Sequence, residues 1–554
     1  MKTKTTKAKQ KSAYEKFCDK CADFYNTHAK NVDWAVIGLI FVICLGARIY
    51  DISIKKQLHP DEVYSLMIST CNQYYNQNIP DGDYTGNELK QLITGDDIGG
   101  VSGALSDVAQ LWKNNGDAPH ASLYYMTLRF FLIGMDNYDL TDFVWRGSIL
   151  NLIFFAISFL LMVRLLRSIY GKRSLLVFVG LAVAFGCAMS VRNTLLIREY
   201  QMAETAIIAM ILVGVNLVLT LRRKEEINVK KYFIGFALSI AAAISLGYFN
   251  AIFVIFFGIG IMICCFRHKQ PRLAWIMASS AIAAVMIAII LYPGFFNFIL
   301  HESVHRERAF SNSNNILKYV FARDLVMSFL TLQGLIGLGA AFIVALVGKN
   351  RISLFKTQNF AWIPVIAIAC MIIIQYASLL KMSRYYFALV PALALLVPHI
   401  ISCVPKSLNG FFELLVVFYF PTLLIFVPAK TIYKDWSDLK KGLGQPTVFY
   451  HLNPNEVARM IPCTVDTISY TISNDIEQLG LNRGETYIAT KQQIGIANDS
   501  ITTYKRPLLK HIKLYKFEYR PTNEDAIEAK YNLTLPDSGN KSVRLFKKNR
   551  HIQH

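Results

Sequence analysis

Residues 119–135 read PHASLYYMTLRFFLIGM, and the placement of this run decides the fold. The run is apolar along most of its length, but it begins beside Pro119 and His120 and carries Arg129 near its middle. A helix that crosses the hydrocarbon core of a membrane needs about 20 apolar residues. The run is short for a span, and whether it crosses determines on which side of the membrane every later loop lies.

The composition is that of a polytopic membrane protein. The chain has 554 residues, of which 53% are hydrophobic and 17% are charged, and its mean hydropathy is +0.34. These values are too apolar for a soluble chain of this length. The net charge of +20 is expected where Lys and Arg fill cytoplasmic loops, and no nucleic-acid-binding signature accompanies it. We therefore expect membrane lipids as partners and no nucleic acid.

The remaining apolar runs predict an all-α polytopic fold with about eleven transmembrane helices. The predicted spans are 34–50, 143–165, 174–190, 202–221, 232–248, 250–266, 274–292, 327–348, 360–380, 385–404 and 411–430.

Charge decides the direction of these spans. The tail 1–33 is rich in Lys, which places it in the cytoplasm. If 119–135 does not cross the membrane, the four basic loops that follow also lie inside: 164–173, 222–231, 267–272 and 349–356. We therefore predict that 119–135 rests on the outer interface as an amphipathic helix.

This topology divides the chain into three parts. The basic tail precedes a catalytic membrane domain, 34–430, whose first outer loop, 51–141, holds juxtamembrane helices. Residues 431–554 form a small extracytoplasmic α/β domain. Its strand-like runs are TVFYHL (447–452), ETYIAT (485–490) and KLYKFEY (513–519), and its helix-like runs are SNDIEQLGL (473–481) and NEDAIEAKY (523–531).

A pair of carboxylates opens the first outer loop. The stretch LHPDEVYSLM, 58–67, places Asp61 and Glu62 beside His59 and Pro60, directly after the first span. Carboxylates are costly near hydrocarbon, so the pair indicates a functional role. A helix start with Asp61 as its cap is the alternative, and it is compatible with catalysis because a cap fixes a side chain.

Further charged residues are expected on the same outer face. They are His120, Arg192, Arg198, Glu199, Glu204, Lys381 and Arg384. Two carboxylate stations and several cations would serve a phosphate-bearing lipid and a proton that must be removed. Other interpretations stay open: Arg198 and Glu199 as a solvated pair, Glu204 as a bridge between helices, and Lys381 and Arg384 as interfacial anchors. Tyr124 lies in an aromatic run typical of an interfacial belt.

As a set, these motifs resemble the GT-C glycosyltransferases, most closely the protein O-mannosyltransferase and aminoarabinose-transferase group. The motifs are the D-E pair just after the first span, an H-(P)-x-L-Y-Y helix before the second, an E-x-x-x-Y-like station after the third, and R-Y-Y at a late outer turn. The likeness covers most of residues 34–400. It implies a polyprenyl-phosphate-linked sugar as donor and an acceptor hydroxyl outside the cytoplasm.

The resemblance also implies roles for single residues. Asp61 falls on the family's acceptor-activating aspartate with Glu62 beside it, Glu199 falls on the second-loop acid, and Arg384 before Tyr385 falls where the donor phosphate is expected. The chain departs from the family at Ala121 and Ser122, which follow His120 where two prolines are common, and at Gln201, where an arginine is usual. Donor identity is the property most affected. A divalent metal is compatible with the chemistry but is not demanded, since Arg and Lys can neutralise the leaving phosphate.

Two rival functions remain. HESVH, 301–305, matches the zincin pattern, in which His301 and His305 would bind zinc, with Asp324 as a candidate third ligand, and Glu302 would activate water. A membrane transporter would have a comparable span count, but it would place ionisable groups at the bilayer midplane. We expect an integral protein of the bacterial inner membrane, and the endoplasmic reticulum is the alternative location. The sequence identifies neither the sugar nor the acceptor.

Overall fold

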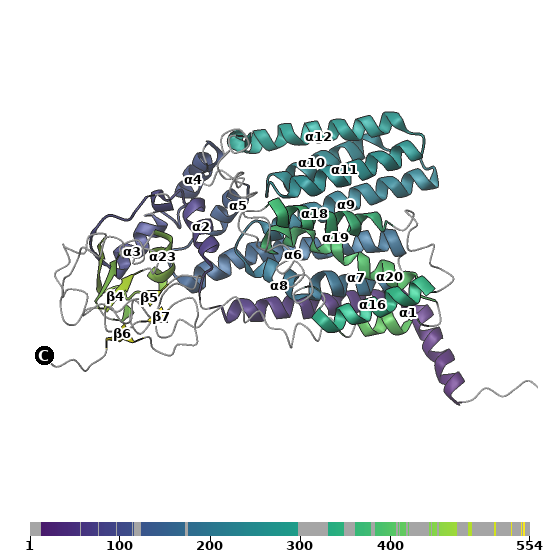
Figure 1. Ribbon diagram of the computed structural model, residues 1–554, viewed down its shortest axis with the longest axis horizontal. Helices are drawn as coiled ribbons and strands as arrows, with labels where there is room; N and C mark the ends of the chain where they lie inside the picture. The colour runs from purple at the N-terminus through teal and green to yellow at the C-terminus, as the bar shows by residue number, and fades with distance from the viewer. Residues whose placement is uncertain are drawn as a thin grey trace, which may run out of the picture.

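The structure is a computed structural model (Figure 1). It describes residues 13–296 apart from 56, 76, 96, 114, 116–122 and 172–174. It then describes 329, 331–347, 360–377, 383–405, 408, 410–416, 419, 443–444, 446–450, 454–473 and 486–489, followed by two short strand pairs between 515 and 548.

Apolar helices form the body of the molecule. They are α1 (Ala13–Ser53), α6 (Leu140–Tyr170), α7 (Leu175–Gly186), α8 (Ala188–Leu195), α9 (Tyr200–Arg223), α10 (Val229–Ile244), α11 (Asn250–Arg267), α12 (Pro271–Leu291), α16 (Thr331–Val347), α18 (Trp362–Ala377), α19 (Val390–Ala394) and α20 (Leu396–Ser402). Among the described residues, six helical segments are long and apolar enough to cross a membrane. The bent pair α7 and α8, which meet at 53°, makes a seventh. The chain is thus a multi-pass membrane protein. The count of eleven stays a prediction, because most of 411–430 lies outside the described residues.

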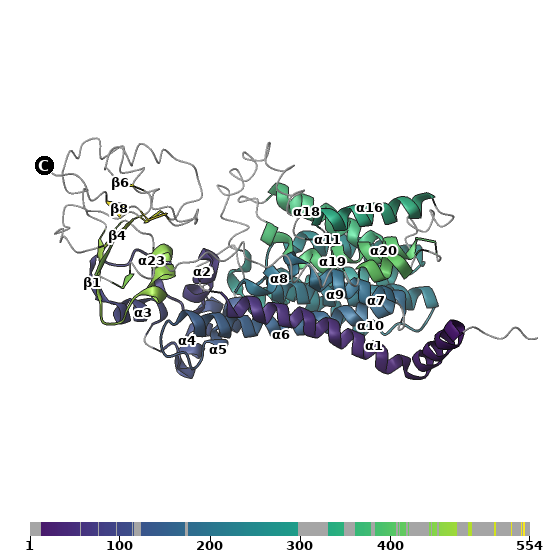
Figure 2. The ribbon, with the colours of Figure 1, turned by 90° about the horizontal axis from the view of Figure 1, so that it is seen from below.

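The predicted first outer loop forms a compact cap at one end of this bundle (Figures 1 and 2). It holds α2 (Pro60–Ser69), α3 (Gly86–Thr94), α4 (Val101–Lys113) and α5 (Leu123–Phe131). At 1.5 Å per residue, the nine-residue α5 is about 14 Å long, far short of a hydrocarbon core. The prediction that 119–135 does not span is therefore confirmed for its described part.

The position of α5 differs from the prediction in one respect. Rather than lying on the interface, the helix packs inside the cap, with the side chain of Arg129 only 1% exposed. Arg129 pairs with Asp107 of α4 at 2.6 Å and donates to the Ile98 carbonyl at 2.7 Å. Apolar side chains point outward from both helices: Val101 and Leu105 of α4, one helical turn apart, are 60% and 57% exposed, and Phe130 of α5 is 44% exposed.

A mixed sheet joins the cap to the C-terminal segment. Its strand order is β1 (Gly82–Thr85), β3 (Ser469–Ser473), β2 (Thr447–Tyr450) and β4 (Thr486–Ala489). β1 is antiparallel to β3, and the other pairs are parallel. β2, β4 and β5 (Tyr515–Lys516) fall within the predicted strand runs, while the predicted helices 473–481 and 523–531 lie largely outside the described residues. The sheet thus combines strands from segments that the sequence assigned to separate domains.

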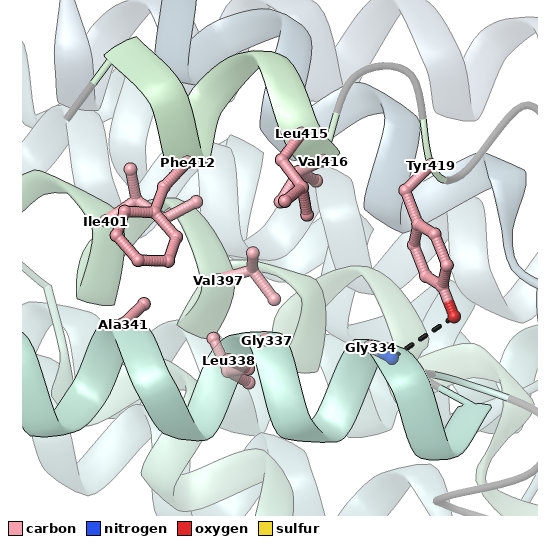
Figure 3. A pocket seen from close by; sticks show the side chains of 10 residues that line it. All are labelled: Gly334, Gly337, Leu338, Ala341, Val397, Ile401, Phe412, Leu415, Val416 and Tyr419. Atoms are coloured by element: carbon pink, nitrogen blue, oxygen red, sulfur yellow. Dashed lines mark hydrogen bonds between the residues drawn. The ribbon is translucent and has the colours of Figure 1, made fainter. Parts of the chain in front are cut away.

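Small residues of α16 border an apolar cavity of about 40 Å³ (Figure 3). Gly334, Gly337 and Ala341 line it together with Val397 and Ile401 of α20. The backbone N–H of Gly334 donates to the Tyr419 hydroxyl at 3.1 Å. A side chain on Gly337 would meet no atom within 4 Å, so open space remains at this position.

Candidate active site at the end of the helix bundle

The local structure of LHPDEVYSLM fixes the start of α2. His59 is the N-cap: its Nδ1 accepts from the Asp61 N–H at 3.2 Å, and the His59 N–H donates to Glu62 Oε2 at 2.7 Å. Pro60 occupies the first helical turn, where its missing N–H costs nothing. The predicted helix start is confirmed, but its capping groups are His59 and Glu62, so the Asp61 carboxylate is available for contacts beyond the helix.

Glu62 ties this turn to the rest of the bundle. Its fully buried carboxylate forms an ion pair with the equally buried Lys55 and accepts from the Ile197 N–H at 2.9 Å. Lys55 also donates to the Leu195 carbonyl at 2.9 Å. Burial lowers the pKa of Lys55, and Glu62 acts in the opposite direction. These bonds join the end of α1 to the junction between α8 and α9.

Asp61 meets a residue from a distant part of the chain. Its Oδ2 lies 2.9 Å from Nη1 of Arg384, which is carried by the 3₁₀ helix Ser383–Leu389. The two side chains are 16% and 12% exposed, so the pair is mostly shielded from water but still reachable. The same Arg384 nitrogen lies 3.4 Å from His59 Nε2, and its guanidinium lies 5.6 Å from the Tyr385 ring. The structure therefore brings together His59, Asp61, Arg384 and Tyr385.

A second charged pair borders the first. Arg198 Nε lies 3.0 Å from Glu199 Oε2, and the two side chains are 4% and 5% exposed. Because both are buried, the interpretation as a solvated pair is wrong. Arg198 also reaches the Asp61 carbonyl oxygen at 3.4 Å. Glu199 lines a narrow cleft together with Tyr200, Tyr248 and Tyr385.

His59 is held in its neutral form. Burial lowers its pKa to about 4; the Asp61 carboxylate opposes this shift, and the Arg384 guanidinium adds to it. A neutral His59 can accept the Asp61 N–H bond that caps α2. The Arg459 side chain of α23 (Pro454–Met460) donates to the Leu58 carbonyl at 3.2 Å. The C-terminal segment thus braces the same turn.

A buried polar cluster lies beneath the site. Glu204 accepts from Gln201 at 2.9 Å and from Asn193 at 2.8 Å, which links α9 to α8 and confirms the bridging interpretation. Arg48 of α1 is fully buried and donates to Thr194, to Ser190 and to the Phe185 carbonyl at the bend between α7 and α8. This arginine was missed, although a charged residue within a predicted span is itself a signal.

The other predicted residues are more dispersed. Tyr124 is buried, and its hydroxyl donates to Asn151 at 3.3 Å, so it belongs to the packing of α5 on α6 and not to an exposed belt. Arg192 lies half-buried on α8. Several predicted residues lie outside the described part of the chain: His120, His301, Glu302, His305, Asp324 and Lys381. Within the described part, no group of three or more His, Cys, Asp and Glu side chains is placed to hold a metal ion.

Neither a family model nor a curated protein sequence matches the chain. Its fold is similar to two crystal structures of ArnT from Cupriavidus metallidurans. The one bound to undecaprenyl phosphate is 10% identical over 93% of this chain and 97% of that chain, with a TM-score of 0.47. The apo structure is 9% identical over 93% of this chain and 98% of that chain, with a TM-score of 0.49.

A third similar structure is the archaeal oligosaccharyltransferase AglB from Archaeoglobus fulgidus, in complex with an inhibitory peptide and a dolichol-phosphate. It is 11% identical over 80% of this chain and 65% of that chain, with a TM-score of 0.41.

Proposed function

We propose that this protein is a membrane glycosyltransferase that moves a sugar from a polyprenyl-phosphate donor to an acceptor hydroxyl on the extracytoplasmic face. The observation that carries this proposal is the pairing of Asp61 with Arg384 at 2.9 Å in a partly shielded position at the end of the helix bundle. A candidate base and a candidate phosphate ligand from distant segments therefore share one site. The capped turn of α2 and the buried pair Lys55 and Glu62 hold that site rigid.

Arg384 is proposed to bind the donor phosphate. A guanidinium presents paired N–H donors that match the oxygens of a phosphate, and it stays charged at every physiological pH. In the free protein the Asp61 carboxylate forms an ion pair with this guanidinium. The arriving phosphate competes for it, so donor binding weakens the ion pair and leaves Asp61 available to the acceptor. Arg384 then stabilises the negative charge that develops on the departing phosphate.

Asp61 is proposed to act as the general base. The acceptor hydroxyl is a weak nucleophile, and its proton passes to the Asp61 carboxylate while its oxygen forms a bond to the anomeric carbon. The bond from that carbon to the phosphate oxygen breaks at the same time, and its electron pair leaves with the polyprenyl phosphate. A single displacement of this kind inverts the anomeric configuration.

The neighbouring residues are assigned supporting roles. Glu62 is fully buried and saturated by internal bonds, so we assign it to positioning the α2 turn and not to direct contact with substrate. Glu199 lines the cleft beside Tyr200 and Tyr385, where it is placed to accept hydrogen bonds from sugar hydroxyls. Arg198 neutralises Glu199 and holds the carbonyl of Asp61.

The test is incubation of purified protein with a panel of polyprenyl-phosphate sugars, with released polyprenyl phosphate as the readout. Wild-type protein is expected to turn over one member of the panel, and Asp61→Asn is expected to slow turnover by about 10²–10⁴-fold while leaving donor binding intact. Asp136→Asn is the matched control, because Asp136 is an exposed aspartate of the same outer loop. Wild-type turnover by Asp61→Asn would remove Asp61 from the base role.

One observation favours a transporter as the second candidate. The bent pair α7 and α8, with Arg48 at its break, is a feature of transporters with discontinuous helices. However, Arg48 is five residues from the end of α1 and Glu204 is four residues from the start of α9, so each lies about 6–8 Å below its helix end. A midplane site would lie about 15 Å deep. Uptake of solute into vesicles without sugar transfer would support the transporter.

A further inference from the structure

A second charged cavity lies at the opposite end of the helix bundle. α6 and α9 both begin near the candidate active site and run 31 and 24 residues away from it, which is about 36–46 Å (Figure 1). A cavity of about 1000 Å³ lies where these helices end and α10 begins. In the proposed topology this end faces the cytoplasm.

The lining of this cavity is strongly basic. Arg164 and Arg167 come from the last two turns of α6, Arg223 from the end of α9 and Lys231 from the first turn of α10. No acidic residue lines the cavity among the described residues. Four positive charges around one hollow create a local field that attracts anions.

Three of these cations have no carboxylate partner in the described part of the chain. Arg167 stacks on the Trp34 ring at 4.3 Å, and Lys231 lies 5.8 Å from the Tyr232 ring. Arg164 makes no ion pair there. The fourth, Arg223, lies 3.7 Å from Glu225, but both side chains are more than half exposed, so this pair is weak. The positive charge is thus largely uncompensated.

The same cavity has apolar walls. Leu212, Val213 and Leu219 of α9 line it, together with Ile169 of α6. Tyr232, whose hydroxyl is 2.9 Å from that of Thr220, lines the cavity next to Lys231 in the chain. An amphiphile with an anionic head and hydrocarbon chains matches this arrangement better than a small anion does, because a small anion would leave the apolar walls unused.

The orientation of the protein in the membrane explains part of this excess of Lys and Arg. Cytoplasmic loops of membrane proteins carry excess Lys and Arg, and cations near the C-terminal ends of helices offset the helix dipole. Neither effect requires the cations to surround a hollow. The turn between α11 and α12 and the start of α12 show the difference, since Lys269 and Arg272 are exposed there and line no described cavity.

We propose that this cavity binds the phosphate headgroup of an anionic membrane phospholipid, with the acyl chains along the apolar wall of α9. Arg164, Arg167 and Lys231 bind the phosphate oxygens, and Tyr232 lies at the boundary between head and chains. Basic pockets between transmembrane helices on the cytoplasmic side are suited to such headgroups. This site is separate from the one at Asp61 and does not depend on the reaction proposed for it.

Native mass spectrometry of delipidated protein tests the proposal. The protein is titrated with phosphatidylglycerol or with phosphatidylethanolamine of the same acyl chains. Phosphatidylglycerol is expected to be retained selectively, and the double variant R164Q/R167Q is expected to bind it about tenfold more weakly, since each cation contributes severalfold. The double variant K269Q/R272Q removes the same charge from exposed positions and is expected to bind like wild type.

A second variant separates charge from space. Ser168→Trp narrows the cavity without changing its charge and is expected to reduce retention of phosphatidylglycerol by a similar factor, because Ser168 lines the cavity. Gel filtration and thermal unfolding show whether each variant is folded. Equal retention of the two lipids, wild-type binding by R164Q/R167Q, or full displacement by equimolar inorganic phosphate would overturn the proposal.

Discussion

Glu62→Gln offers a quantitative test of how the α2 turn is held in place. The substitution keeps the shape of the side chain but removes the charge that neutralises Lys55, and both groups are fully buried. Breaking a buried ion pair by removing one partner costs about 3–5 kcal/mol. One of the two bonds accepted from the N–H groups of Ile197 and His59 is also lost, because the glutamine amide has a single accepting oxygen and its NH2 group cannot accept.

The expected effect on melting temperature follows from chain size. With an unfolding entropy of about 2.1 cal/mol/K per residue, the whole chain has about 1.2 kcal/mol/K, so a loss of 3–5 kcal/mol lowers Tm by about 3–4 °C. Replacing both partners, in Lys55→Met/Glu62→Gln, removes the uncompensated charge and is expected to recover most of that loss. The order of Tm is therefore wild type, double variant, single variant.

Thermal unfolding in detergent, followed by circular dichroism, measures this order. Glu225→Gln is the matched control, because Glu225 forms an ion pair that is more than half exposed and is expected to change Tm by less than about 1 °C. A double variant less stable than Glu62→Gln would refute the reasoning, as would a single variant indistinguishable from the control.

The remaining predictions concern the site and its cap. Arg384→Gln is expected to lower kcat by about 10²–10³-fold, because the leaving phosphate loses the guanidinium that stabilises its charge. Arg384→Lys keeps a positive charge and is expected to lower kcat by less. Steady-state release of polyprenyl phosphate measures both values, and an unchanged kcat would contradict the proposed role of Arg384. His59 has a folded pKa of about 4 against 6.5 when unfolded, so the unfolded chain binds more protons between these values and stability falls as pH drops from about 6.5 to 4. The difference in Tm between wild type and His59→Gln should change with pH between about 6.5 and 4 and should not change with pH above 6.5. A difference in Tm that is independent of pH over the whole range would argue against a neutral His59. Arg129→Gln leaves Asp107 without its ion-pair partner. Protease is then expected to cleave α4 and α5 at temperatures well below the global unfolding transition. Cleavage only at the global transition would show that this ion pair does not hold the cap together.

Much of the bundle could be predicted from composition. The run 119–135 could not be assigned by hydropathy alone. The charge of the later loops predicted that it does not span, and the nine-residue α5 agrees with that prediction. What the sequence did not reveal is that α5 is buried under α4, because that packing depends on Arg129 meeting Asp107, an ion pair between two helices of the loop. β1 was likewise missed, since its four residues become a strand only by pairing with β3.

The sequence predicted those site residues that are charged and that lie at the ends of apolar runs. Asp61 and Arg384 were singled out because charged side chains at the ends of apolar runs need a reason. Lys55 and Arg459 were missed because their roles exist only in three dimensions: one neutralises Glu62, and the other reaches Leu58 from the C-terminal segment. Local sequence gives no sign of either contact.

A double-mutant cycle on turnover tests the shared role of Asp61 and Arg384 most directly. Residues that act as one catalytic unit are strongly non-additive, so Asp61→Asn/Arg384→Gln should release polyprenyl phosphate about as slowly as the slower single variant. If the double variant instead shows the product of the two single losses, the two residues act independently and the proposed joint site is wrong.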